Sequence, residues 1–154
     1  MICESRGQLL TLRQRWREQG RTVVFTNGCY DILHAGHIRL LEQARSMGDV
    51  LVLALNTDAS VARMKGASRP IISQTQRAAL ASRLAAVDAV TFFDEDTPTE
   101  LIAALLPDVL VKGSDWTHYI AGKEEVEAAG GKVVTIPLEV GYSTSNVIAD
   151  ALSR

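Results

Sequence analysis

The chain has 154 residues, of which 47% are hydrophobic and 22% are charged, and its net charge at pH 7 is -2. This length is enough to bury a hydrophobic core without disulfides or structural metals, and the composition excludes a disordered or fibrous protein. A net charge near zero gives no general attraction to nucleic acid or to acidic membranes, so we expect neither as a partner. Any phosphate binding must be the local property of one pocket.

The two cysteines, Cys3 and Cys29, are too few for a disulfide framework, which favours a reducing compartment. The first residues lack the apolar core of a secretory signal, and no later apolar run is long enough to span a bilayer. We therefore expect a cytoplasmic protein.

Helix-like and strand-like patterns alternate along the chain. Residues 9–19 predict an amphipathic helix that Gly20 ends. Short apolar runs rich in β-branched residues predict buried strands at 22–26, 50–55, 89–93, 109–111 and 132–136. Further helices are predicted at 37–47, 74–86, 98–106, 122–129 and 144–152, and the longest irregular stretch is 67–73.

This alternation predicts a parallel sheet, because a strand, a helix and the next parallel strand join by a right-handed crossover. We expect one doubly wound, Rossmann-like α/β domain, with five parallel strands covered by helices on both faces. The domain would span residues 1–154, as an N-terminal helix (1–20) and a catalytic core (21–154). Ligands of such sheets bind beyond the carboxyl ends of the strands.

The segment that follows the first strand, residues 27–37, carries the most chemical information. Gly28 permits a backbone geometry that a side chain would obstruct, and Gly36 lets a phosphate approach the amides of a helix N-terminus. His34 and His37, three residues apart, could donate hydrogen bonds to the same phosphate. Together these residues indicate a phosphate cradle.

Two other interpretations of this segment stay open. Histidines beside a glycine are common as turn or capping residues. Cys29, His34 and His37 could also bind a metal, although their spacing fits no common zinc pattern and the sequence suggests no fourth ligand.

The segment resembles the signature of the cytidylyltransferase-like nucleotidyltransferase superfamily: a glycine, an aromatic-aspartate pair and His-x-Gly-His after the first strand. Further motifs follow in the order of that family: Lys65-Gly66, Arg69-Pro70, Gln76-Arg77, Lys112-Gly113-Ser114-Asp115 and Gly141-Tyr142-Ser143-Thr144-Ser145. Over about residues 20–150 the wording is most similar to the stand-alone D-glycero-β-D-manno-heptose 1-phosphate adenylyltransferases, notably at Asn56-Thr57-Asp58 and Glu95-Asp96-Thr97-Pro98.

The resemblance implies transfer of AMP from ATP to a sugar 1-phosphate, which yields ADP-heptose for lipopolysaccharide and releases pyrophosphate. It implies Mg²⁺ held mostly through the ATP phosphates, since the sequence shows no carboxylate cluster for a dedicated metal site. It also implies a homodimer or a larger homo-oligomer.

The resemblance assigns roles to individual residues. His34, His37 and Lys65 would be catalytic, the histidines by binding phosphates and Lys65 by holding the acceptor or the α-phosphate. The implied nucleotide-binding residues are Gly28, Cys29, Tyr30, Gly36, Lys112, Gly113, Gly141, Ser143, Thr144 and Ser145. The implied acceptor-binding residues are Asn27, Asp31, Arg69, Arg77 and Asp115.

Ordinary structural roles remain open for several of these residues. Lys65, Arg69 and Arg77 could each be an exposed, solvated cation, Asp115 could cap a turn, and hydroxyls at 143–145 could cap the following helix.

The chain departs from the family pattern near its last motif. Several members carry an arginine shortly before the glycine, whereas residues 137–141 read Pro-Leu-Glu-Val-Gly, and Tyr142 replaces a small or aliphatic residue. The prediction of adenine as the nucleotide base therefore depends on the motifs that resemble the subfamily. Cytidylyl or adenylyl transfer to another phosphorylated acceptor, such as glycerol 3-phosphate, and a nucleotide-binding regulator without catalysis stay open.

Overall fold

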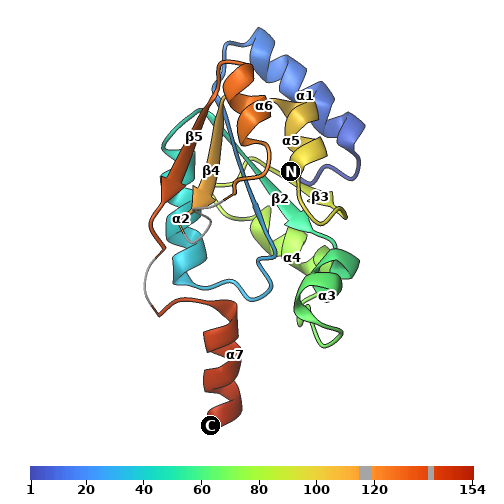
Figure 1. Cartoon of the computed structure of the whole chain (residues 1–154), viewed down its shortest axis with the longest axis vertical. Coiled ribbons are helices and arrows are strands. Elements are labelled where there is room, and N and C mark those ends of the chain that lie inside the picture. The colour runs from blue at the N-terminus through green and yellow to red at the C-terminus, as the bar shows by residue number, and fades with distance from the viewer. Residues whose placement is uncertain (115–118, 139–140) are drawn as a thin grey trace.

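A computed structural model of the chain describes residues 1–114, 119–138 and 141–154. It contains a parallel sheet with the strand order β3-β2-β1-β4-β5 (Figure 1). The strands are β1 (Val23–Gly28), β2 (Val50–Asn56), β3 (Ala89–Phe93), β4 (Val109–Gly113) and β5 (Lys132–Ile136). The helices are α1 (Arg6–Glu18), α2 (Ala35–Arg45), α3 (Asp58–Lys65), α4 (Gln74–Ala81), α5 (Thr99–Leu105), α6 (Lys123–Ala128) and α7 (Thr144–Ser153). The predicted α/β class and parallel five-stranded sheet are confirmed.

The strand order changes direction between β1 and β4. From β1 the chain moves outward to β2 and β3, and it then returns to the other side of β1 for β4 and β5. Such a switch point opens a crevice at the carboxyl ends of the two central strands, which is where ligands of doubly wound sheets bind.

Hydrophobic clusters cover both faces of the sheet. One cluster joins alternate strand residues such as Phe25 to α1, α5 and α6, and we call this side the α5 side. The other joins the intervening residues, such as Val24, to α2 and α4, and we call it the α2 side. Since successive side chains of a strand point to opposite faces, each strand ends with side chains on both sides of the crevice.

Arg13 holds α1 in position. This residue is only 6% exposed, although it does not belong to the apolar pattern that predicted a helix at residues 9–19. Its guanidinium donates to both carboxylate oxygens of Asp108 at 3.1 Å and to the carbonyl oxygen of Leu106 at 2.7 Å. Asp108 also accepts the backbone N–H of Val23. The helix is thereby fixed against the α5 side, at the amino ends of β1 and β4.

The element α3 was absent from the prediction. Its first turn is capped by Thr57, whose Oγ1 accepts the backbone N–H of Ser60 at 3.1 Å. Within this helix only Ser60 and Val61 are buried, so the apolar period on which the prediction depended is too weak to see.

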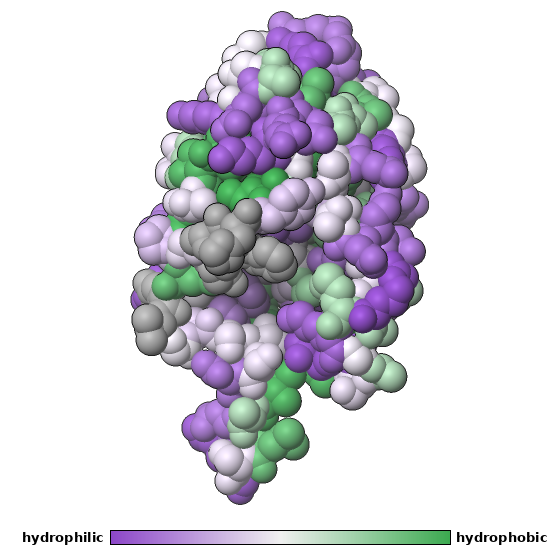
Figure 2. All heavy atoms as spheres, in the orientation of Figure 1, coloured by the Kyte–Doolittle hydropathy of each residue, from purple (hydrophilic) through white to green (hydrophobic). Residues whose placement is uncertain are grey.

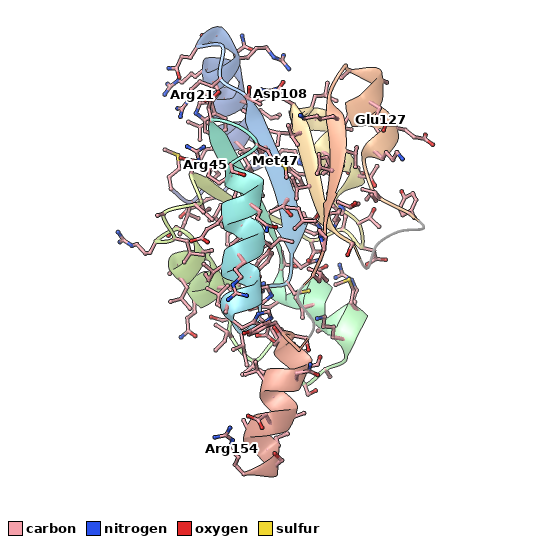
Figure 3. All side chains as sticks on the ribbon, turned by 90° about the vertical axis from the view of Figure 1, so that its left-hand side faces the viewer. Arg21, Arg45, Met47, Asp108, Glu127 and Arg154 are labelled. Carbon is pink, nitrogen blue, oxygen red and sulfur yellow. The ribbon has the colours of Figure 1, made fainter. Side chains whose placement is uncertain are left out.

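The last helix, α7, projects from the body and carries the C-terminus at Arg154 (Figures 1 and 3). Hydrophobic residues lie along one edge of it (Figure 2), and among them Leu152 is 83% exposed. Its first turn is tied to the loop before α2, because Thr144 Oγ1 donates to the carbonyl oxygen of Ile32 at 3.2 Å. The N-termini of α2 and α7 therefore meet at the crevice.

Within the described ranges, no helix combines the length and the apolar character needed to cross a bilayer.

Candidate active site

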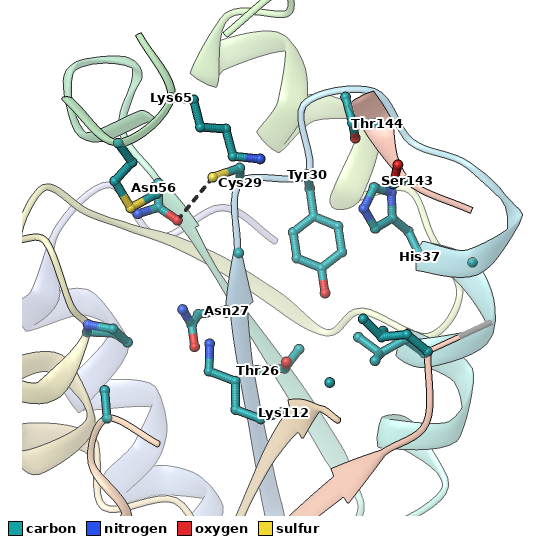
Figure 4. Close-up of a pocket in the computed structure, with 18 of the residues that line it drawn as sticks. Thr26, Asn27, Cys29, Tyr30, His37, Asn56, Lys65, Lys112, Ser143 and Thr144 are labelled. Atoms are coloured by element: carbon teal, nitrogen blue, oxygen red, sulfur yellow. Dashed lines mark hydrogen bonds between the residues drawn. The ribbon is translucent and has the colours of Figure 1, made fainter. Parts of the chain in front are cut away.

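A cavity of about 400 Å³ opens at the carboxyl ends of β1, β2 and β4, within the size range of small-molecule sites. The structure brings many of the predicted site residues together there (Figure 4). Those that line the cavity are Asn27, Gly28, Cys29, Tyr30, His34, Gly36, His37, Lys65, Lys112, Gly113, Ser143, Thr144 and Ser145.

His34 and His37 cap α2 reciprocally. The Nδ1 atom of His34 accepts the backbone N–H of His37 at 3.4 Å, and Nδ1 of His37 accepts that of His34 at 3.3 Å. Their rings stack with centroids 3.7 Å apart. Because a backbone N–H can only donate, both Nδ1 atoms carry lone pairs, and each neutral ring carries its proton on Nε2. The pair thus combines the capping role with two N–H donors for a ligand.

The electrostatic environment keeps these rings neutral. Burial lowers the pKa of His34. Burial lowers the pKa of His37 to about 4, and two repulsions act in the same direction, one from the protonated form of His34 and one from the Lys65 ammonium group. Protonation would also place a hydrogen on Nδ1, opposite a backbone N–H. In the unliganded protein at neutral pH, both histidines are therefore neutral hydrogen-bond donors.

Two lysines reach the cavity from different elements. Lys65 is the last residue of α3, and its side chain extends toward Cys29, whereas Lys112 lies in β4 and extends toward Asn27 (Figure 4). Since opposite charges attract strongly in a partly enclosed site, these cations favour anionic ligands. The cavity thus offers positive charge from β4 and α3 and neutral donors from α2.

The cysteine of the motif is a poor candidate for a nucleophile or a metal ligand. Burial raises the pKa of Cys29, although the charges of Lys65 and Arg77 act in the opposite direction. Its Sγ lies 3.7 Å from Oδ1 of Asn56, to which the thiol donates (Figure 4). A protonated thiol is neither a good nucleophile nor a good metal ligand.

Two glycines of the motif are required by close contacts. A Cβ at Gly28 would lie 2.8 Å from Cε2 of Tyr30, and a Cβ at Gly36 would lie 2.8 Å from Cβ of Tyr142. Tyr142, which departs from the family pattern, stacks on His34 with ring centroids 6.1 Å apart, and the guanidinium of Arg39 lies over its ring. Gly36 therefore makes room for a tyrosine that forms one wall of the cavity.

The cavity has two chemically different halves. On the α2 side lie the paired histidines, the N-termini of α2 and α7, and the apolar surfaces of Leu40, Leu138 and Tyr142. On the α5 side, strand alternation places the side chains of Asn27, Asn56, Phe93 and Lys112, next to Asp96 and Thr97 of the loop between β3 and α5.

The family model described as Cytidylyltransferase-like matches residues 25–150. The chain belongs to this family. It is accordingly a nucleotidyltransferase, and the resemblance seen in the motifs is confirmed.

Two similar curated proteins are considerably longer than this chain. The chain is 54% identical over 139 residues to a protein named "Bifunctional protein HldE" from Syntrophotalea carbinolica, which covers 90% of the chain and 28% of that protein. It is 55% identical over 141 residues to the protein of the same name from Methylobacillus flagellatus. That match covers 91% of this chain and 29% of the relative. The chain thus spans less than a third of the length of these relatives.

Solved structures share the fold. A lipopolysaccharide core biosynthesis protein from Thermoplasma volcanium superposes with a TM-score of 0.64 and is 30% identical, covering 78% of this chain and 98% of that one. A pantoate-beta-alanine ligase from Francisella tularensis has a TM-score of 0.68 at 15% identity, which shows a common fold alone.

Arg77, predicted from the family motif to bind the acceptor, is 1% exposed and is not among the described residues that line the cavity. Its Nη1 donates to the carbonyl oxygens of Cys29 at 2.7 Å and Asn56 at 2.9 Å. Its Nε donates to the carbonyl oxygen of Ile72 and its Nη2 to Asp58. The guanidinium therefore ties the ends of β1 and β2 to α3 and to the segment before α4.

Asp31 of the family signature, like Arg77, makes buried contacts within the protein. Its carboxylate accepts the backbone N–H groups of Ile71 and Ile72 at 2.9 and 2.8 Å, and Nε of Arg69 at 2.7 Å. Burial alone would raise the pKa of Asp31, but these hydrogen bonds and the Arg69 charge lower it. Neither Asp31 nor Arg69 is among the described lining residues, so the pair fixes residues 67–73 against the motif.

Two predicted site residues, Gly141 and Asp115, are not among the described residues that line the cavity. Gly141 has a positive φ of 92° and is exposed just before Tyr142, outside the described cavity lining. Asp115, predicted to bind the acceptor, lies outside the described residues, as do Trp116, Glu139 and Val140.

The sequence interpretation gave no role to several residues that line the cavity. They are Thr26, Leu40, Asn56, Met64, Phe93, Asp96, Thr97, Pro98, Tyr119, Ala121, Leu138 and Tyr142. Those at the ends of β2 and β3 could have been found from the rule that ligands bind beyond the carboxyl ends of parallel strands.

In the described part of the chain, no three side chains of histidine, cysteine, aspartate or glutamate converge to hold a metal ion. The zinc arrangement considered for Cys29, His34 and His37 is therefore not formed.

Proposed function

We propose that the chain transfers AMP from ATP to D-glycero-β-D-manno-heptose 1-phosphate, giving ADP-heptose and pyrophosphate for lipopolysaccharide synthesis. The sequence motifs support this substrate pair, as do relatives named HldE at 54% and 55% identity. The observation that carries the proposal is the paired histidine cap at the N-terminus of α2, facing the same cavity as Lys65 and Lys112.

The triphosphate would lie where α2 and α7 begin. Helix N-termini carry free backbone N–H groups and a partial positive charge, so two of them at one cavity favour a polyanion. Thr144 and Ser145 of α7 line the same space, and the Nε2–H groups of His34 and His37 add side-chain donors. The apolar surfaces of Leu40 and Leu138, beside Tyr142, would accept the base.

The reaction needs no general base. The phosphate of a sugar 1-phosphate has a second pKa of about 6, so its oxygen is already ionised near neutral pH and can attack the α-phosphorus directly. The leaving pyrophosphate takes the bonding electrons. What the protein must supply is alignment of the two anions and stabilisation of the charge that accumulates on the phosphate oxygens.

The neutral histidines supply hydrogen bonds rather than protons. In the unliganded protein the pKa of His37 is about 4, so its ring is neutral and its Nε2–H would be available as a donor in the cavity that the residue lines. One preorganised donor of this kind is worth about 3 kcal/mol in the transition state. Lys65 would hold the acceptor phosphate or the α-phosphate, and Lys112 would add charge from the opposite side.

Mg²⁺ bound to ATP would neutralise part of the triphosphate charge. The described residues form no carboxylate cage, which supports binding of the ion mainly through the ATP phosphates.

The acceptor would occupy the α5 side. Of the residues predicted to bind it, Asn27 lines the cavity, whereas Asp31, Arg69 and Arg77 are engaged in the buried contacts described above. We therefore propose that these three residues shape the cavity without touching substrate.

The test is pyrophosphate release by the purified protein with Mg²⁺, with ATP, CTP and GTP each paired with heptose 1-phosphate, glycerol 3-phosphate and pantetheine phosphate. Turnover confined to ATP with heptose 1-phosphate is the expected result. Turnover only with another pair would replace the proposed substrates within the same class. Nucleotide binding without turnover across the panel would identify a regulator.

A further inference from the structure

The side chain of Asn27 carries a buried hydrogen-bond acceptor that has no partner among the described residues. Its Oδ1 is shielded from solvent, yet no group in the described part of the chain donates a hydrogen bond to it. Buried polar atoms of native proteins are nearly always paired, so an orphan inside a ligand cavity needs an explanation. Asn27 also lines that cavity at the end of β1 (Figure 4).

The neighbouring asparagine shows the ordinary arrangement. Asn56, one strand away, accepts from Sγ of Cys29 through Oδ1 and donates through Nδ2 to Oγ of Ser60 at 3.0 Å. Both ends of that amide are used within the protein, and Asn56 holds the fold together around the motif. The two asparagines therefore line the same cavity but differ in their hydrogen bonds, because the side-chain oxygen of Asn56 is paired and that of Asn27 is not.

The position of Asn27 points to the acceptor rather than to the nucleotide. Like Phe25 two residues earlier, it faces the α5 side of the sheet, away from the helix N-termini and the histidine pair. Two polar residues of the loop between β3 and α5, Asp96 and Thr97, also line the cavity on that side. A polyhydroxylated sugar matches such a mixture of donors and acceptors better than an adenine ring does.

We propose that Asn27 is a specificity-determining residue, whose Oδ1 accepts a hydrogen bond from one hydroxyl group of the acceptor sugar. This inference rests on the proposed function. A sugar that lacks the hydroxyl leaves Oδ1 buried and unpaired, and a site built in this way discriminates against deoxy analogues far more strongly than an apolar pocket discriminates by size.

The test compares wild type with Asn27→Leu, which keeps the shape of the side chain and removes its polar atoms. Steady-state kinetics are measured separately for ATP and for heptose 1-phosphate, together with the thermal unfolding midpoint. We expect the KM for the sugar phosphate to rise about tenfold, as the loss of one hydrogen bond predicts, and the KM for ATP to stay within about twofold. The unfolding midpoint should not fall, because no protein partner is left unpaired.

Gln14→Leu is the matched control, since it also removes an amide but lies exposed on α1, outside the described cavity lining. It should leave both KM values unchanged. A second arm uses five sugar 1-phosphates that each lack one hydroxyl group, namely the 2-deoxy, 3-deoxy, 4-deoxy, 6-deoxy and 7-deoxy analogues. For wild type, kcat/KM should be much lower with one of these analogues than with the parent sugar. In Asn27→Leu, kcat/KM for that analogue and for the parent sugar should be about equal.

The outcomes separate the two proposals. Wild type without turnover on heptose 1-phosphate overturns the proposed function and this inference with it. Normal wild-type turnover with an unchanged sugar KM in Asn27→Leu overturns this inference alone, as does a rise confined to the KM for ATP. A lowered unfolding midpoint with unchanged kinetics would show that Asn27 has a structural role, and would also overturn it.

Discussion

His34 and His37 each accept the backbone N–H of the other through Nδ1, at 3.4 and 3.3 Å, so one pair of rings both caps α2 and presents two Nε2–H donors. The two nitrogens of each ring have separate roles. This separation allows the structural and the catalytic contributions of a histidine to be measured independently.

The first prediction uses this separation. His34→Asn should keep the cap, because asparagine is among the best residues at an N-cap, but it removes the Nε2–H donor. We expect the unfolding midpoint to stay near that of wild type while kcat falls about a hundredfold. His34→Ala is the comparison, and it should lower both quantities. A His34→Asn enzyme with the full wild-type rate would contradict the assignment.

The second prediction concerns pH. His37 has a pKa of about 4 in the folded protein, below the ordinary histidine value of 6.5. Between these values the unfolded chain binds more protons than the folded one, so the free energy of unfolding should decrease as the pH falls from about 7 toward 4. Urea unfolding at several pH values measures this. His37→Asn should flatten part of the dependence, and an identical slope in that variant would remove His37 as its source.

The third prediction concerns Lys65, which is exposed at the end of α3. Lys65→Met removes positive charge from the cavity while leaving the fold intact, because no buried contact depends on the exposed end of the side chain. Activity (kcat/KM) toward the acceptor should fall on the order of a hundredfold, with an unchanged unfolding midpoint. Lys65→Arg should recover part of the activity. Wild-type kinetics for Lys65→Met would exclude the lysine from substrate binding.

The fourth prediction distinguishes Arg77 from Lys65. Arg77→Met leaves the carbonyl oxygens of Cys29 and Asn56 buried without their donor, so the free energy of unfolding should fall by about 3 kcal/mol. Substrate KM values of the protein that still folds should change little. Chemical denaturation and kinetics on the same preparation test this. Normal stability combined with a large loss of substrate binding would restore the role that the family motif suggested.

The fifth prediction tests the close approach of Tyr142. A Cβ added at Gly36 would lie 2.8 Å from Cβ of Tyr142, so Gly36→Ala should displace that wall of the cavity and raise the KM for ATP several-fold. Gly7→Ala in α1, where an added Cβ would lie 3.9 Å from Oγ of Ser5, is the control and should be neutral or slightly stabilising. An unchanged KM in Gly36→Ala would show that Tyr142 does not border the nucleotide.

Much of the fold could be predicted from local pattern. The strands are short runs of apolar residues buried on both sides, and such runs are visible without any tertiary information. The motif after β1 also pointed to the correct end of the sheet. By contrast, α3 depends on the Thr57 cap and buries few side chains, so it leaves little periodic signal.

The site was harder to predict because a residue type does not reveal its partners. Arg77 has the appearance of a surface arginine, yet it shares one buried stripe of α4 with Ala78 and Ala81, and that helical spacing was the available signal. For Asp31, the partners are backbone N–H groups some 40 residues away in sequence, which no local pattern contains. The predicted oligomer and cytoplasmic location stay predictions.

The most direct test of the central claim is to follow the conversion of ATP and D-glycero-β-D-manno-heptose 1-phosphate by ³¹P NMR, with wild type and with His37→Asn, in the presence of Mg²⁺. We predict that wild type forms the diphosphate linkage of ADP-heptose together with an equal amount of pyrophosphate, and that His37→Asn, folded to the same extent, forms both at least about a hundredfold more slowly. Absence of ADP-heptose with wild type, or equal rates for the two proteins, would contradict the account.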